Sequence, residues 1–265
     1  VIAKVEQATA QAMDRRRQLP CLGGLSASGP QCGLAFHGAE SGYLQRVDMP
    51  ALQRLAARNR LRITLAVVPG GMIVPSRPLG YVLPDGPDSG AIDAGVLRAA
   101  FTVGPVRLFD DDPRFGLVVL AEIGSRALSP GINDPGTAIG ILGSLQRLFA
   151  DWVSPVEPAA PEYDRIAAPT LSLDDMFDDV FPALARDGAG LIEVAMRVQR
   201  VLGELSRCGD PQLALVARRH AELALARAER ALDFPPDLAL VRRQHADYHP
   251  VPACAASGAG PHLPE

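Results

Sequence analysis

Apolar and polar residues repeat with different periods in three successive parts of the chain. In the first 19 residues, apolar side chains recur every three or four positions, as at Ile2, Val5 and Ala12, until Pro20 ends the pattern. This spacing predicts an amphipathic helix. Over residues 32–110 the apolar runs are short and separated by glycine and proline, which is typical of strands and turns. After residue 110 the helical spacing returns.

The part from 32 to 110 predicts a small β-rich unit with one inserted helix. Strands are expected at 34–37, 43–47, 62–68, 79–83 and 101–109. The inserted helix begins after Asp48, a favourable N-cap residue, and has Pro50 in its first turn. Residues 21–30 precede this unit and are rich in glycine and serine, so they predict a linker.

The part after residue 110 predicts helices joined by turns. Asp112-Pro113 and Asp134-Pro135 each predict the start of a helix. The aspartate carboxylate faces the positive end of the helix dipole, and the N–H that proline lacks would have no partner within the helix. The two helices form a hairpin that breaks at residues 129–131. Further along, apolar residues from Leu191 to Leu205 step by three and four positions like a heptad seam, and an alanine stripe runs through 217–231.

These patterns predict an α+β fold, in which a β-rich, barrel-like (barrel-sandwich-like) unit is followed by a helical unit with helical hairpins. A short strand is also expected at 165–171, inside the helical part. The expected parts are an N-terminal helix and linker at 1–31, the β-rich unit at 32–110, the helical unit at 111–248 and a disordered tail at 249–265.

The charge balance narrows the classes of partner and cofactor. The chain has 26 Lys and Arg against 30 Asp and Glu, so it lacks the positive field that collects nucleic-acid phosphates. Lys4 is the single lysine, which leaves the β-rich unit without an amine for an aldimine, lipoyl or biotinyl group. We therefore expect no nucleic-acid partner and no cofactor. The four cysteines form no CxxC pair, which favours free thiols.

The turn between the first two long helices of the helical part concentrates proline, glycine and polar residues. Capping explains these residue types, with Gly131 in the left-handed conformation, which Asn133 also tolerates, and Asp134 as N-cap of the next helix. Alternatively, the free N–H groups at that helix start and a nearby arginine form an anion-sized site. The ligand-binding candidates are Arg126, Ser129, Asn133, Asp134, Gly136 and Thr137. The sequence leaves both alternatives open, and it contains no recognised catalytic signature.

Three other clusters have a simpler interpretation. The acidic groups at 110–112 and 174–179 are expected to be solvated carboxylates at helix starts, because no calcium-loop spacing is present. His245 and His249 lack an evident third ligand, so we expect no metal site. The basic cluster Arg15–Arg17 is either a solvated helix face or, beside a membrane helix, a marker of the cytoplasmic side that contacts anionic headgroups.

Several motifs occur together and in order along the chain. They are SGYLQRVD at 41–48, VPG at 68–70 with PL at 78–79, RFGL at 114–117 and ALSPGINDP at 127–135. In this combination the chain resembles a bacterial family of predicted membrane proteins, domain of unknown function 2254, over about residues 1–235. The resemblance implies N-terminal transmembrane helices that are absent from this chain, and it implies no established reaction.

A weaker resemblance lies within the first. Residues 70–79 are similar to one half of a lipoyl- or biotinyl-type hairpin, with Gly71 where Asp is usual and Ser76 where Gly is usual. This resemblance implies a barrel-like fold, but no lysine is available for modification.

The first functional hypothesis is a non-enzymatic, cytoplasmic domain of an inner-membrane protein that acts in assembly, ligand sensing or gating. It rests on the start without Met, which favours a fragment, on the basic cluster, on the heptad-like seam and on the lack of a catalytic constellation. The alternative is an enzyme or small-anion site at the 129–137 turn. A third hypothesis is a homo-oligomer that assembles through the 191–205 seam, in which Val198→Asp would disrupt the oligomer.

Overall fold

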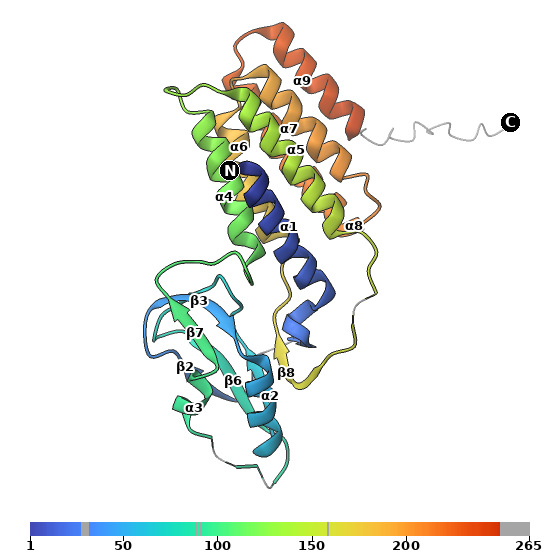
Figure 1. Cartoon of the computed structure of the whole chain (residues 1–265). Helices are drawn as coiled ribbons and strands as arrows, with labels where there is room; N and C mark the ends of the chain where they lie inside the picture. Colours follow the sequence, from blue (N-terminus) through green and yellow to red (C-terminus); the bar gives the residue numbers. More distant parts are fainter. Residues whose placement is uncertain (28–31, 88, 91, 158, 250–265) are drawn as a thin grey trace, which may run out of the picture.

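The computed structural model describes residues 1–27, 32–87, 89, 90, 92–157 and 159–249. Figure 1 shows helices gathered in one unit and strands in a second unit beside its end. Of the expected tail at 249–265, only His249 lies within the described residues. The helical unit contains α1 (Ile2–Gln18), α4 (Pro113–Ala127), α5 (Pro135–Trp152), α6 (Leu173–Asp187), α7 (Ile192–Leu205), α8 (Pro211–Ala231) and α9 (Pro235–Tyr248).

The strands form two open sheets. A five-stranded sheet has the order β1-β8-β4-β6-β2, and a three-stranded sheet has the order β5-β3-β7. Both sheets have two edge strands among the described residues, so the expected barrel is not confirmed. The strands are β1 (Gly24–Ser26), β2 (Leu34–His37), β3 (Gly42–Val47), β4 (Leu61–Leu65), β5 (Met72–Ile73), β6 (Pro78–Pro84), β7 (Phe101–Gly104) and β8 (Tyr163–Ala168). Two helices accompany them, α2 (Met49–Arg58) and α3 (Ala94–Arg98).

The larger sheet draws its strands from segments far apart in the sequence. Strand β8 lies between β1 and β4 and is parallel to both. The expectation of a linker at 21–30 is wrong for β1, which hydrogen-bonds to β8. Gly24 permits this pairing, because a Cβ atom there would lie 2.5 Å from the carbonyl oxygen of Ile166. The turn before β1 carries two left-handed residues, Cys21 at φ 55° and Leu22 at φ 59°.

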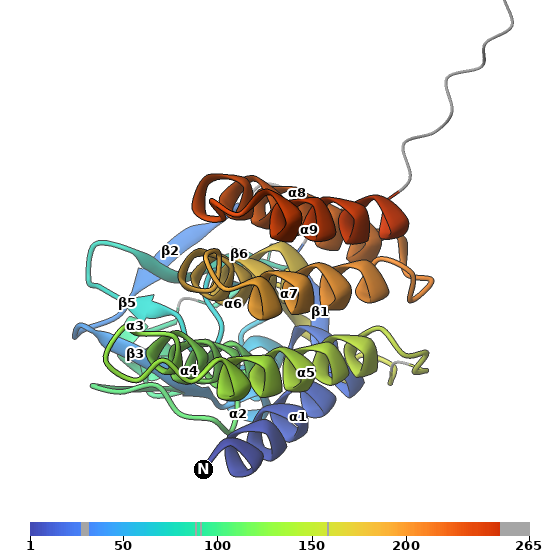
Figure 2. The ribbon, with the colours of Figure 1, turned by 90° about the horizontal axis from the view of Figure 1, so that it is seen from above.

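The helical unit is built in layers. Viewed from above, α8 and α9 cover α6 and α7, which in turn cover α4 and α5, and α1 lies against the outer side of the last pair (Figure 2). The 191–205 seam lies inside this stack, since Val194, Val198 and Val201 are at most 1 % exposed and belong to the large apolar core. The interpretation of the seam as an oligomer interface is therefore wrong, because its apolar face is already covered within the chain.

The alanine stripe of α8 faces inward, and its small side chains let the neighbouring helices approach. Ala217 and Ala221 are fully buried in the large core. Ala228 forms a smaller cluster with Ala195 of α7 and Val241 of α9. Within the described residues, helix α9 adds no side chain to the large core.

Arginines at the end of α1 hold the junction between the two units. Arg15 donates to the main-chain carbonyl of Asp110, and Arg16 donates to that of Asp111 at 3.0 Å. Arg17 donates to the carbonyl of Asp151 at the end of α5, at 2.6 Å. We call these contacts of Arg15, Arg16 and Arg17 the arginine clasp. The expectation that this basic cluster is a solvated face, or is available to headgroups, is wrong for Arg16, which is only 6 % exposed.

Asp112 completes the junction from the other side. Its carboxylate accepts two hydrogen bonds from Arg107, at 2.6 and 2.9 Å, and one from the Phe115 N–H at 3.1 Å as the N-cap of α4. Asp112 is 3 % exposed, so the expectation of a solvated carboxylate is wrong here. Gly70, at φ +93°, makes room for it, because a Cβ atom there would lie 2.6 Å from Asp112 Oδ1.

Helices α1 and α4 approach closely at a glycine. Replacing Gly116 with alanine is expected to destabilise the fold, because the added Cβ would lie 2.8 Å from Thr9 Cβ, which is fully buried. Overpacking of this kind costs about 1–3 kcal/mol and outweighs the roughly 1 kcal/mol that alanine gains over glycine within a helix. Urea unfolding followed by circular dichroism measures the net effect.

Gly140 on α5 provides the matched control, since no atom outside its own helix would lie within 4 Å of an added Cβ. Gly140→Ala is expected to raise the free energy of unfolding by up to about 1 kcal/mol. A shift of both variants in the same direction would contradict the close contact between α1 and α4.

Candidate functional site at the turn between α4 and α5

Main-chain hydrogen bonds fix the turn that joins α4 to α5. The Asn133 N–H donates to the carbonyl of Ser129 at 2.9 Å, and the Asp134 N–H donates to that of Ala127 at 2.8 Å. The Ser129 hydroxyl donates to the carbonyl of Arg126 at 2.7 Å. The carbonyls of Arg126 and Ala127, the last two residues of α4, therefore have partners without any ligand.

Asn133 is the residue that adopts the left-handed conformation, with φ 48°. The expectation that Gly131 does so is wrong, because its φ is not positive. Asparagine tolerates this region better than other residues with a Cβ atom. Residues 131–134 are all exposed, so the turn projects into solvent rather than into the core.

Asp134 occupies the start of α5. Its carboxylate accepts from the Thr137 N–H at 3.0 Å and from the Thr137 hydroxyl at 2.6 Å. These bonds, the side-chain one first, and a further one from the Gly136 N–H lower the pKa of the Asp134 carboxyl. The N–H groups that the sequence offers to an anion therefore already face a carboxylate of the chain itself.

Two hollows flank the turn, and Arg126 borders both of them. One, of about 930 Å³, lies between α4 and α6 and includes Ser129. The other, of about 510 Å³, includes Asp134 and Thr137 together with Val1. The Arg126 side chain has no hydrogen bond or ion pair within the described part of the chain. Of the six candidates, Asn133 and Gly136 border neither hollow.

Helix α6 contributes polar side chains that the sequence analysis did not include. Asp187 accepts a hydrogen bond from the Ser125 hydroxyl of α4 and pairs with Arg186 at 2.6 Å. Arg186 is the main cause that lowers the pKa of the Asp187 carboxyl, with a further contribution from Ser125. No sequence signal identifies these residues, because α4 and α6 meet only through the tertiary fold.

The acidic residues of α6 form ion pairs. Arg114 on α4 pairs with Asp179 at 2.6 Å and with Asp175 at 2.9 Å. Arg219 on α8 pairs with Asp174 at 2.9 Å and with Asp178 at 3.2 Å. These contacts tie α6 to both of its neighbours, so the expectation that the carboxylates are simply solvated is incomplete.

The histidines of α9 also have a structural setting. The His245 ring lies 2.9 Å from Gln199 Oε1 through Nδ1, and its centroid is 4.9 Å from that of His249. Burial and nearby cations lower the pKa of His249 to about 4. In the described ranges, no three His, Cys, Asp or Glu side chains gather in a way that could hold a metal ion.

With the geometry established, comparison with known proteins decides the family. A family model described as Predicted membrane protein (DUF2254) matches residues 1–204. The chain belongs to this family. The resemblance drawn from the motifs is thereby confirmed, although the DUF2254 match ends before residue 235. Within the described residues, no helix has both the length and the apolar composition needed to span a bilayer.

The curated relatives have no assigned function. Uncharacterized proteins of Mycobacterium tuberculosis and Mycobacterium bovis are each 33 % identical to the chain over 128 residues. These matches cover 47 % of this chain but 25 % of each relative, so the relatives are much longer than the matched segment. No solved structure matches the chain. Neither the comparisons nor the contacts at the turn assign it a ligand, so the six candidates stay a prediction.

The negative charge of Asp134 is predicted to contribute to the stability of the protein. Its pKa is lowered from the ordinary value of 3.8, so its contribution is complete above that value and is lost as the pH falls through the lower folded pKa. Asp134→Asn keeps a capping oxygen without the charge. The variant is therefore expected to be less stable than the wild type at pH 7, and the difference should shrink toward pH 3 in urea titrations.

Asp134→Ala is the companion variant, because it removes the capping oxygen as well as the charge. It is expected to be the less stable of the two variants at both pH values. A difference between wild type and Asp134→Asn that stays constant with pH would contradict the role of the charge.

Proposed function

We propose that this chain is a cytoplasmic part of a bacterial membrane protein, in which α1 couples the membrane portion to the two units described above. Membership of a family of predicted membrane proteins supports the association with a membrane. The observation that carries the coupling role is the arginine clasp, because it connects α1 at once to the junction and to the end of α5.

Contacts along α1 support the same role. Glu6 accepts hydrogen bonds from the Ser144 hydroxyl at 2.7 Å and from Arg147 at 2.6 Å, both on α5. The Arg147 bond is partly exposed, whereas Thr9 and Met13 of α1 are buried against the core. A displacement of α1 would therefore disturb both α5 and the segment that enters α4, which is the requirement for gating or for the transmission of a sensed signal.

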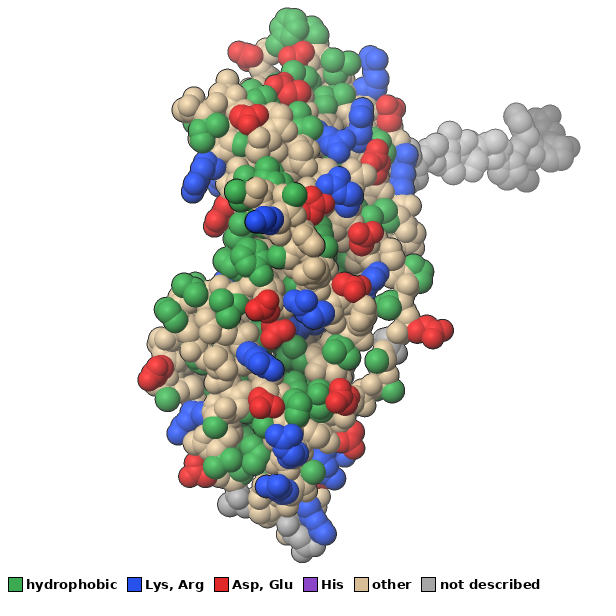
Figure 3. All heavy atoms as spheres, viewed as in Figure 1, with side chains coloured by type: hydrophobic (Ala, Val, Ile, Leu, Met, Phe, Trp, Pro, Cys, Tyr) green, Lys and Arg blue, Asp and Glu red, His purple; other side chains and the backbone are tan. Residues whose placement is uncertain are grey.

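Assembly is the less favoured of the three roles considered at the level of sequence. The apolar seam of α7 is covered within the chain, so a homo-oligomer would need another surface. The face in Figure 3 carries acidic and basic side chains interspersed with small apolar areas. This distribution does not mark an interface, and the homo-oligomer stays a prediction.

The cytoplasmic location predicts how an exposed thiol reacts. Cys208 is exposed in the turn between α7 and α8. In the longer membrane protein, with the other cysteines replaced by serine, Cys208 should resist a membrane-impermeant maleimide in intact cells and react after permeabilisation. Mass-tag gel shifts measure the labelled fraction. Cys208→Ser is the control for background labelling, and strong labelling in intact cells would place this part outside the cytoplasm.

The coupling role predicts the effect of weakening the clasp. Lysine keeps the charge of arginine but lacks its planar fork of donors. The double variant Arg15→Lys with Arg16→Lys is therefore expected to speed amide hydrogen exchange at residues 109–113 and at the end of α1, in the membrane-embedded protein. Mass spectrometry of the peptides measures the change.

Arg230→Lys, on the exposed end of α8, is the matched control, and it should leave these peptides unchanged. Exchange that increases equally over the whole chain would indicate general destabilisation and would contradict a local coupling element. Unchanged exchange at 109–113 in the double variant would also count against the proposal.

A further inference from the structure

A hollow of about 260 Å³ lies between the C-terminal halves of α1 and α5, which run side by side (Figure 1 and Figure 2). On α1 it is bordered by residues 10, 13, 14 and 17, and on α5 by residues 148, 151 and 152. This spacing places each set on one face of its helix, so the two faces border the hollow from opposite sides. The binding inferred below does not depend on the coupling role proposed for α1.

The inner part of the hollow is apolar. Met13 and Leu148 lie beneath it and are 3 % exposed, and the partly buried Trp152 packs against the edge of the large core. Ala10 borders the hollow with a single methyl group, which leaves space that a longer side chain would occupy. A ligand with a small apolar body would therefore remove apolar surface from water here.

The cation at the rim of the hollow is already engaged. Arg17 Nη1 donates to the main-chain carbonyls of Asp151 and Ser154, at 2.6 and 3.3 Å. Its Nη2 donates to the Asp14 carboxylate at 2.9 Å, which also accepts from Gln18 at 2.7 Å. An anionic ligand would have to replace these acceptors before Arg17 could bind it, so the contacts of Arg17 disfavour anions.

The charge that is left without a partner at this hollow is negative. The Asp151 side chain is exposed, and its carboxylate has no hydrogen bond or ion pair to any described residue. Asp151 lies in the last turn of α5, which contains no basic residue to balance the negative end of the helix dipole. The neighbouring Trp152 is of the residue type that attracts cations most strongly. Together these features favour a ligand with one positive charge.

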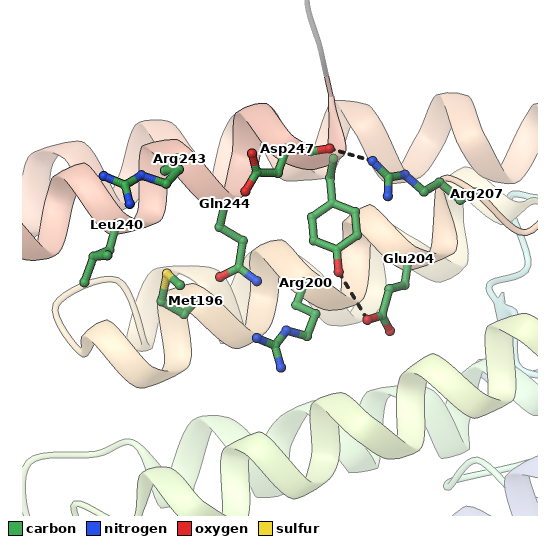
Figure 4. A pocket seen from close by; sticks show the side chains of 9 residues that line it. Met196, Arg200, Glu204, Arg207, Leu240, Arg243, Gln244 and Asp247 are labelled. Carbon is green, nitrogen blue, oxygen red and sulfur yellow. Dashed lines mark hydrogen bonds between the residues drawn. The ribbon is translucent and has the colours of Figure 1, made fainter.

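The larger hollow between α7 and α9, of about 550 Å³, lacks such convergence. Figure 4 shows that the Arg243 side chain runs along α9, whereas Arg200 lies on the side of α7 away from α9. Glu204 accepts from the Tyr248 hydroxyl at 3.2 Å, and Arg207 donates to the carbonyl of Asp247 at 2.6 Å. The groups without partners there point apart, so one small ligand could not contact both arginines.

We propose that the hollow between α1 and α5 binds a small organic cation, a primary amine with an apolar body. Its ammonium group donates to the Asp151 carboxylate at the rim. Its apolar body contacts Ala10 and Trp152, above the buried side chains of Met13 and Leu148. The bound amine adds contacts between α1 and α5 that the chain alone does not make.

Tryptophan fluorescence tests the proposal, because Trp152 is the single tryptophan of the chain and borders the hollow. Titration of the purified chain with 2-phenylethylamine is expected to give a saturable change, with Kd on the order of 1 mM. Two analogues separate the charge from the apolar body, because 2-phenylethanol is uncharged and 3-phenylpropanoate is an anion. Each analogue is expected to bind at least about fivefold more weakly than the amine.

Variants connect the binding to the residues. Asp151→Asn removes the charge but keeps the main-chain carbonyl that Arg17 binds, and it is expected to weaken binding of 2-phenylethylamine at least about threefold. Ala10→Leu fills the hollow and is expected to weaken binding at least about tenfold. The matched controls are Asp233→Asn and Ala226→Leu, which are exposed positions that do not border the hollow and should bind like the wild type.

Urea unfolding verifies that each variant is folded. Asp151 is exposed, so Asp151→Asn remains decisive if Ala10→Leu is unstable. The proposal is overturned if 2-phenylethylamine does not bind, or if Asp151→Asn binds it like Asp233→Asn. Equally tight binding of 2-phenylethanol or 3-phenylpropanoate would also overturn it, because the hollow would then select an apolar body without a positive charge.

Discussion

Guanidinium groups of α1 donate to main-chain carbonyls in the segment that joins the β-rich unit to the helical unit, and these bonds fix how the two units meet. The carbonyls of Asp110 and Asp111 precede α4 and have no partner within that helix, and Arg15 and Arg16 of α1 supply it. Burial lowers the pKa of the Arg16 guanidinium, and the charge of Asp111 is the main factor that offsets this effect. The placement of α1, and with it the surface that α1 presents to α5, follows from this junction.

Much of the helical unit could be predicted, because its signals are local. Each long helix of the hairpin begins at an aspartate that accepts from an N–H three residues later, as Asp112 and Asp134 do. Such caps depend only on neighbours in sequence. The apolar spacing on α7 correctly predicts a helix, whereas the hypothesis that this face forms an oligomer interface is wrong. Periodicity identifies an apolar face without identifying what covers it.

The failures share a physical cause, which is pairing between distant segments. Strand β1 has no alternating pattern of its own, and it becomes a strand only because β8 pairs with it. The expected barrel is not confirmed for the same reason, since closure depends on which strands pair. At the candidate site, the turn residues Asn133 and Asp134 were identified from their types, whereas Asp187 could not be, because α6 reaches the turn only in the folded chain.

The position of α9 allows the surface beside α7 to change in evolution without a change in the large apolar core. This helix and α7 border a hollow of about 550 Å³. Helix α9 is absent from the large apolar core, and it lies beyond the segment matched by the family model. Substitutions at Leu240 or Arg243 can therefore change the surface between α7 and α9 while the large core keeps its packing. Members of one family can in this way share a core and differ in the surface that α9 presents beside α7.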